Sequence, residues 1–228
     1  MNVTQTLTRG TPRSGTVQTT AAQVATQEGV LKRFLWLYGV YSLLSLLSYL
    51  FGYYFLPEGF FRGTPVTAAG EVANSPDTFW GQFALTLLFN LGWMIGLTVL
   101  LNFNQVKGFP VAFLLPMSLG ITSGLISGSN SFVASNLDLY SAHEGLALAH
   151  SIGGLEMMGY ILIIAATVRL GIYQYRSWWR WGGEWKPTKL MNIRDIRFSA
   201  TEVLAIVAGV ALLVFAAYRE TLMAFNLL

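Results

Sequence analysis

The apolar and polar positions along the chain divide it into five long apolar segments with polar stretches between them. Each segment reaches the roughly 20 residues that an α-helix needs to cross the hydrocarbon core of a bilayer. None shows the sustained period-two alternation of a strand, and an open strand edge would leave backbone groups unpaired in lipid. The pattern predicts an all-α integral membrane helical bundle with about five transmembrane helices, at residues 34–55, 80–101, 109–128, 145–170 and 199–218.

Two polar stretches stand out from the apolar segments. Residues 1–30 are rich in Thr and Gln and contain no apolar run, so we expect a disordered tail. Residues 31–228 then form one transmembrane helical domain. Within it, residues 171–198 are expected to form a cytoplasmic, aromatic and basic loop at the membrane interface.

Lys and Arg residues are divided unevenly between the connecting segments. With the N-terminus inside, eleven of them fall on the cytoplasmic side, and only Arg62 and Arg219 fall outside. Positive residues favour the cytoplasmic side of a membrane protein. We therefore expect a cytoplasmic N-terminus and a C-terminus on the opposite side, in a bacterial-type energy-transducing or plasma membrane.

Composition agrees with a membrane location and narrows the chemistry. The chain is 54% hydrophobic and 11% charged, against about 25% charged in ordinary soluble domains. It contains no cysteine, which excludes disulfides, thiolate metal sites and a cysteine nucleophile. No serine and histidine pair, paired acids or metal-ligand spacing points to catalysis, so we expect neither an enzyme nor a metal site.

Small residues recur at four-residue spacing in several predicted spans, which lets helix backbones approach closely. This spacing predicts helix packing within the monomer. The alternative is a face that docks a partner helix or a second copy of the chain. The glycines concerned are Gly92, Gly96, Gly120, Gly124, Gly128, Gly153 and Gly154.

Glu156 is the only acidic residue near the middle of a predicted span. An ionisable group at that depth costs at least ~2.5 kcal/mol unless it is paired or hydrated, so Glu156 is the leading functional candidate. Neighbouring spans offer Asn90, Ser118 and Thr122 as partners. Its role is either a hydrogen-bonded or protonated tie between helices, or the binding of a proton, ion or substrate.

His143 and His150 are seven positions apart, so they share one face of a continuous helix. In one interpretation, His150 ligates the metal of a tetrapyrrole or takes part in a proton path. In the other, both histidines are interfacial groups near the outer surface. Glu156 is rotated by about 120° from His150 on a helix, so the two form a poor metal chelate.

A capping box opens the last predicted span. Ser199 and Glu202 have the spacing at which each side chain bonds the backbone N–H of the other. Glu202 is therefore assigned to helix initiation.

The segment 171–198 interleaves aromatic and basic side chains. On the cytoplasmic side this mixture suits the headgroup layer, where rings anchor and cations meet anionic lipid. A protein-docking element is the alternative, and nucleic acid is not an expected partner because the loop is tethered to the bilayer. The residues are Arg176, Trp178, Trp179, Arg180, Trp181 and Trp185.

From the second span onward, short motifs match the layout of a known family. They are Phe89-Asn90-Leu91-Gly92, the pair Gly120 and Gly124, and Gly153-Gly154-Leu155-Glu156 running on to Arg169-Leu170-Gly171. Over roughly two-thirds of the chain, this layout resembles the stage II sporulation protein M (SpoIIM-like) family of small multi-span membrane proteins. The His-Gly pair typical of that family is Ile152-Gly153 here.

Three functions are compatible with these features. The resemblance implies a non-enzymatic accessory or assembly subunit of a larger membrane complex, with other membrane subunits as partners. A small transporter or permease would use Glu156 as a coupling carboxyl in a water-filled cavity at the midplane. A pigment- or haem-ligating subunit of a photosynthetic or respiratory complex would hold its tetrapyrrole through His150.

Overall fold

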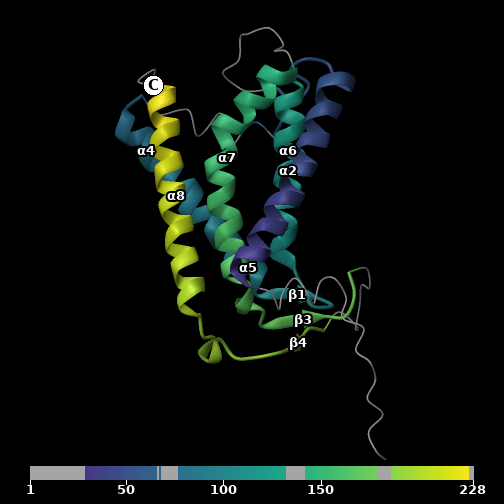
Figure 1. The fold of residues 1–228 in the computed structure, drawn as a ribbon, viewed down its shortest axis with the longest axis vertical. Helices are drawn as coiled ribbons and strands as arrows, with labels where there is room; N and C mark the ends of the chain where they lie inside the picture. The colour runs from purple at the N-terminus through teal and green to yellow at the C-terminus, as the bar shows by residue number, and fades with distance from the viewer. Residues whose placement is uncertain (1–28, 66, 68–76, 132–141, 179–185, 226–228) are drawn as a thin grey trace, which may run out of the picture.

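The computed structural model describes residues 29–65, 67, 77–131, 142–178 and 186–225, and between 142 and 152 it describes only the side chain of Leu146. The described chain is mostly helical, and its long helices stand side by side with a small sheet at one end of the bundle (Figure 1). We call this end the sheet end and the opposite end the far end. Most of the predicted tail lies outside the described residues, as do Trp179, Arg180, Trp181 and Trp185.

Every predicted span corresponds to a helix. The first is α2 (Val30–Phe55), and the second consists of α4 (Phe79–Leu87), the π-helical turn η1 (Leu88–Met94) and α5 (Ile95–Asn102). The third begins with the 3₁₀ turn η2 (Val111–Phe113) and continues as α6 (Leu114–Gly128). The rest are α7 (Ala142–Ala166), the 3₁₀ turns η3 (Val168–Leu170) and η4 (Ile193–Asp195), and α8 (Ala200–Ala224).

Four of these helices are long and apolar enough to cross a membrane, which indicates a multi-pass membrane protein. They are Val30–Phe55, Phe79–Asn102, Val111–Gly128 and Ala200–Ala224. The fifth helix, α7, has 25 residues, but the apolar part that the structure describes, Gly153–Ala166, is shorter than the other four.

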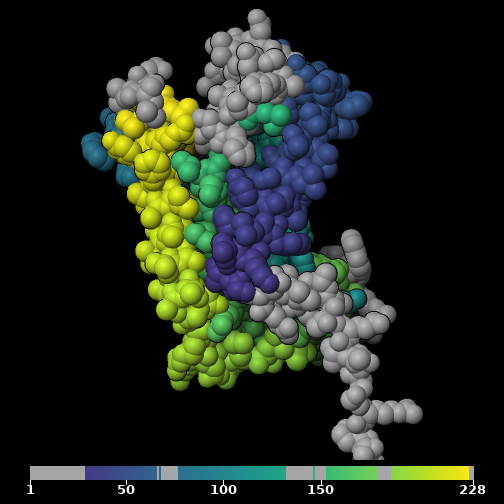
Figure 2. Space-filling model, viewed as in Figure 1, coloured from purple at the N-terminus to yellow at the C-terminus, as the bar shows by residue number. Residues whose placement is uncertain are grey.

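Large apolar side chains cover much of the outside of the bundle. On one face, α8 and α2 lie outermost with part of α7 visible between them (Figure 2). Both outer helices expose leucine and phenylalanine, for example Leu47 and Phe51 on α2 and Leu204 and Phe215 on α8. Such an exterior suits contact with lipid, because acyl chains are as apolar as these side chains.

The prediction of an all-α fold is wrong in one respect, because the sheet end carries a four-stranded sheet. Its order is β2 (Phe109–Pro110), β1 (Asn104–Val106), β3 (Tyr173–Tyr175) and β4 (Thr188–Lys189). β1 and β3 pair in parallel, and the other two pairs are antiparallel. The segment 171–198, expected to be a loop, thus supplies two strands. Strands of two or three residues are too short to leave a periodic signal in the sequence.

Close backbone contact joins α2 to α6. A Cβ atom added to Gly120, Gly124 or Gly128 would lie less than 3.0 Å from a backbone carbonyl oxygen of α2. Likewise, a Cβ atom added to Gly52 of α2 would lie 2.9 Å from the carbonyl oxygen of Leu125 of α6. This glycine stripe therefore packs within the chain, as small-residue stripes do in membrane bundles.

A second close crossing joins α7 to α8 at two glycines that the sequence pattern did not single out. A Cβ atom on Gly159 or on Gly209 would lie 3.0 Å from the carbonyl oxygen of the other residue. Any larger residue at either position would push the two helices apart.

Three other predicted packing glycines do not touch a neighbouring element. A Cβ atom on Gly92 would meet only Leu88 of the same helical segment, and one on Gly96 or Gly153 would meet nothing within 4 Å. Among the described residues these three positions do not hold helices together. Gly153 and Gly154 instead line a cavity.

Apolar side chains fill the sheet-end half of the bundle. Ile161, Ile164 and Ala165 of α7 are 0% exposed, and they share one cluster with Leu37 of α2 and Phe113 of η2. This cluster closes the interior of the bundle toward the sheet end.

The capping box at the start of α8 is confirmed. The backbone N–H of Glu202 donates to Oγ of Ser199 at 3.3 Å, and the N–H of Ser199 donates to Oε2 of Glu202 at 2.8 Å. The other carboxylate oxygen, Oε1, lies 2.7 Å from Nε of Arg169 and 3.5 Å from Nη2 of Arg33. Glu202 therefore does more than begin a helix, because it ties α8 to α2 and to η3.

Candidate functional site

A cavity of about 530 Å³ lies between α2, α6, α7 and η1. Its lining runs from Tyr160 and Glu156, near the middle of α7, toward the far end past Ser127 of α6 and Leu146 of α7. On the other side of Glu156 lies the apolar cluster that closes the sheet-end half. The described lining thus extends from mid-depth of the bundle toward the far end.

Glu156 is held by two neutral side chains. Nδ2 of Asn90 donates a hydrogen bond to Oε1 of Glu156. The hydroxyl of Tyr160 donates to Oδ1 of Asn90 at 2.7 Å and lies 3.5 Å from the same oxygen of Glu156. Of the partners expected from the sequence, Asn90 is therefore in place, whereas Ser118 and Thr122 donate to backbone carbonyls of their own helix.

The π-helical turn η1 positions Asn90. The N–H of Ile95 donates to the carbonyl oxygen of Asn90, five residues earlier, where an α-helix would use a spacing of four. Such turns are rare and frequently occur at functional sites. Here the turn carries the one buried residue of this segment, Asn90, and places it opposite Glu156.

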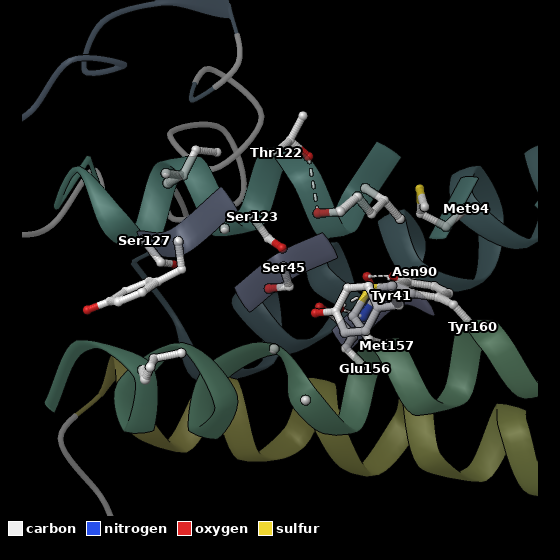
Figure 3. A pocket seen from close by; sticks show the side chains of 17 residues that line it. Tyr41, Ser45, Asn90, Met94, Thr122, Ser123, Ser127, Glu156, Met157 and Tyr160 are labelled. Atoms are coloured by element: carbon white, nitrogen blue, oxygen red, sulfur yellow. Dashed lines mark hydrogen bonds between the residues drawn. The ribbon is translucent and has the colours of Figure 1, made fainter. Parts of the chain in front are cut away.

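The cavity combines one acid with hydroxyl and aromatic groups. Figure 3 shows Asn90, Glu156 and Tyr160 together at one end, with Ser45, Ser123 and other hydroxyl-bearing side chains further along. Among the described residues that line the cavity, Glu156 is the only acidic one and none is basic. The described side chains around its carboxyl group therefore supply hydrogen-bond donors but no cation.

One residue that contacts Glu156 was not predicted from the sequence. Tyr160 was missed although it lies one helical turn after Glu156, where i and i+4 side chains meet. Glu220 of α8 is not among the described residues that line the cavity, although α8 continues to Ala224, past the predicted end of the span at residue 218.

The histidines belong to α7, but their side chains are outside the described residues, so the tetrapyrrole role of His150 stays a prediction. Within the part of the chain that the structure describes, no three His, Asp or Glu residues come together as a metal site.

At the sheet end, Arg176 and Trp178 directly follow β3, and both are exposed. The Trp178 ring lies 6.0 Å from that of Phe109. The four other predicted interface residues fall outside the described chain.

No family model, curated protein or solved structure matches this chain. The resemblance to the SpoIIM-like family therefore rests on the short sequence motifs alone.

Proposed function

We propose that the protein is a small transporter that binds an organic cation in its central cavity, with Glu156 as the binding carboxyl. The observation that carries this proposal is that Glu156, at mid-depth of a long helix, lines a cavity instead of packing in the apolar cluster. Intramembrane acids that face a cavity mark substrate or ion pathways. A positive ligand is favoured because charge attraction is strong where the surroundings are poorly polarisable.

The lining of the cavity supports a small organic ligand. Its volume falls within the roughly 300–1,000 Å³ that is usual for small-molecule sites. The rings of Tyr41 and Tyr160 offer aromatic faces, which attract cations. Ser45, Ser123 and Glu156 supply acceptor oxygens for the N–H groups of an amine.

The path of the chain supports five crossings. α6 ends at the far end, and α7 begins there and returns to the sheet end (Figure 1). If α6 and α8 both cross the bilayer, α7 must cross between them. Basic residues near the sheet end, such as Lys107, Arg176 and Lys189, support a cytoplasmic location of that end.

Binding of a simple cation tests this function. We would measure tetramethylammonium binding to the purified chain by calorimetry, comparing Glu156→Gln with Asp77→Asn, which removes an exposed acid just before α4. We expect binding that Glu156→Gln abolishes and that Asp77→Asn leaves unchanged. Failure of the unaltered protein to bind this cation and methylammonium, or equal binding by Glu156→Gln, would overturn the proposal.

The second candidate is the accessory or assembly subunit that the resemblance implies. The observation that favours it lies at the sheet end, where Trp178 borders an apolar hollow of about 290 Å³ next to the exposed Arg176. This combination suits a membrane partner or an anionic headgroup. Removing 171–198 would break the sheet, so the double variant Arg176→Ala/Trp178→Ala is the better test. Subunits that co-purify with the unaltered chain from native membranes should be lost, and unchanged co-purification would contradict this role.

A further inference from the structure

A polar hollow of about 360 Å³ lies at the sheet end, apart from the central cavity. Its described lining holds two cationic side chains, one amide, one phenol and one aliphatic hydroxyl, and no acid. These residues are Lys107, Gln174, Tyr175, Arg176 and Thr188. Ammonium, guanidinium, amide and hydroxyl groups can all donate hydrogen bonds. The lining therefore suits an anion with several acceptor oxygens.

The strand register brings the two cations together. Val106 of β1 pairs in parallel with Tyr175 of β3, so the next positions along the two strands are Lys107 and Arg176. The backbone N–H of Lys107 donates to the carbonyl oxygen of Tyr175 at 2.9 Å, which continues the ladder past the end of β1. Like charges on neighbouring strands destabilise a sheet. An anion bound between them would offset this repulsion.

Neither cation is neutralised within the part of the chain that the structure describes. The ion pairs found there join Glu202 to two arginines at the start of α8 and Glu58 to Arg62 at the far end. Lys107 and Arg176 are both exposed, so a ligand can reach them. Arginine and lysine are the side chains that most often bind phosphate, arginine through its planar fork and lysine as a point charge. The pair therefore matches a phosphate group.

The hollow also lies close to the ends of three helical segments. Lys107 is five residues after the end of α5 and four before η2, and η3 ends three residues before β3. These short connections keep the β1–β2 turn near the membrane surface. Next to the polar hollow, the apolar hollow at Trp178 shares the lining residue Tyr175. Such aromatic rings are typical of the headgroup level of a bilayer.

We propose that the polar hollow binds a phosphate group between Lys107 and Arg176, with anionic lipid headgroups and soluble phosphate compounds as the two sources. The position beside the helix ends favours the lipid, because anionic lipids attract basic groups at the cytoplasmic surface. A bound phosphate would join the ends of β1 and β3, and through them α5 and α7. The site uses neither Glu156 nor the central cavity, so it does not depend on the proposed transport function.

Binding of two phosphate probes to the purified chain tests the site. Native mass spectrometry in an uncharged detergent measures phosphatidylglycerol binding against phosphatidylcholine, and calorimetry measures binding of inorganic phosphate. The test variant is Lys107→Asn/Arg176→Gln, in which Asn tolerates the positive φ of position 107. The matched control, Lys186→Gln/Arg194→Gln, removes the same charge from two exposed residues that do not line the hollow. Arg176→Gln alone leaves the β1–β2 turn unaltered.

We expect phosphatidylglycerol to bind more tightly than phosphatidylcholine. Affinity should fall about fivefold in Arg176→Gln and about 30-fold in the double variant, since each basic residue contributes about fivefold. The control variant should bind as the unaltered chain does. If inorganic phosphate alone shows this dependence, the site stands and its source is a soluble phosphate compound. Failure of both probes to bind, or an equal loss in the control variant, would overturn the proposal.

Discussion

Replacing Glu202 with Ala should be one of the most damaging single changes at the sheet end. Loss of the capping box costs about 1 kcal/mol. Arg33, with a side chain 4% exposed, would keep a buried charge without its carboxylate, which costs about 3–5 kcal/mol. Arg169 is 56% exposed, so its lost pairing adds about 1 kcal/mol or less. We expect the free energy of unfolding to fall by about 4–7 kcal/mol.

Two further variants isolate the buried charge as the cause. Arg169→Ala removes only the exposed partner and should cost about 1 kcal/mol or less. The double variant Arg33→Met/Glu202→Met removes both buried charges, so most of the stability should return. The assay is unfolding by denaturant in bicelles, followed by tryptophan fluorescence. If Glu202→Ala costs no more than Arg169→Ala, or if the double variant is no more stable than Glu202→Ala, the buried pair is not what stabilises this end.

Two other changes test the packing and the sheet. Gly124→Val should cost about 1–3 kcal/mol through overpacking against α2, whereas Gly153→Ala, with open space around it, should be near neutral in the same unfolding assay. Lys107 lies in the β1–β2 turn with φ +53°, next to Gly108 at φ +82°, a conformation that favours Asn followed by Gly. Lys107→Asn should therefore increase the free energy of unfolding by about 0.5 kcal/mol and raise the thermal midpoint. A lower midpoint would show that the Lys107 side chain makes a contact that stabilises the protein by more than its positive φ destabilises it.

Hydropathy located the helices because a membrane-spanning helix needs about 20 apolar residues, and these residues are consecutive in the sequence. It could not locate the sheet, because the pairing of Asn104 with Tyr173 depends on where distant segments end. The glycine stripe on α6 could be predicted for the same reason, because its glycines recur every four residues within one short segment. Gly159 and Gly209 each stand alone in the sequence and become a pair only when α7 meets α8.

Glu156, at the centre of the site, could be predicted from the sequence, but most of the residues around it could not. Glu156 stands out because an acid in an apolar helix is costly. Its partner Asn90 was one of three polar candidates, and only the π-helical turn distinguishes it from the others. The last span was predicted to end too early, at residue 218, because Arg219 and Glu220 interrupt the apolar pattern before the last apolar residues of α8.

The parallel pairing of β1 with β3 has a consequence for biosynthesis. β1 leaves the ribosome before α6 and α7, and β3 only after them, so the central pair of the sheet has to wait for both helices. At roughly 5–20 residues per second, this interval lasts several seconds, during which the β1–β2 hairpin offers an unpaired edge. β3 can pair with β1 only if α7 ends at the sheet end, where α6 begins. Pairing of β1 with β3 therefore requires that α6 and α7 have run in opposite directions, so the sheet can form only after both helices have taken their places.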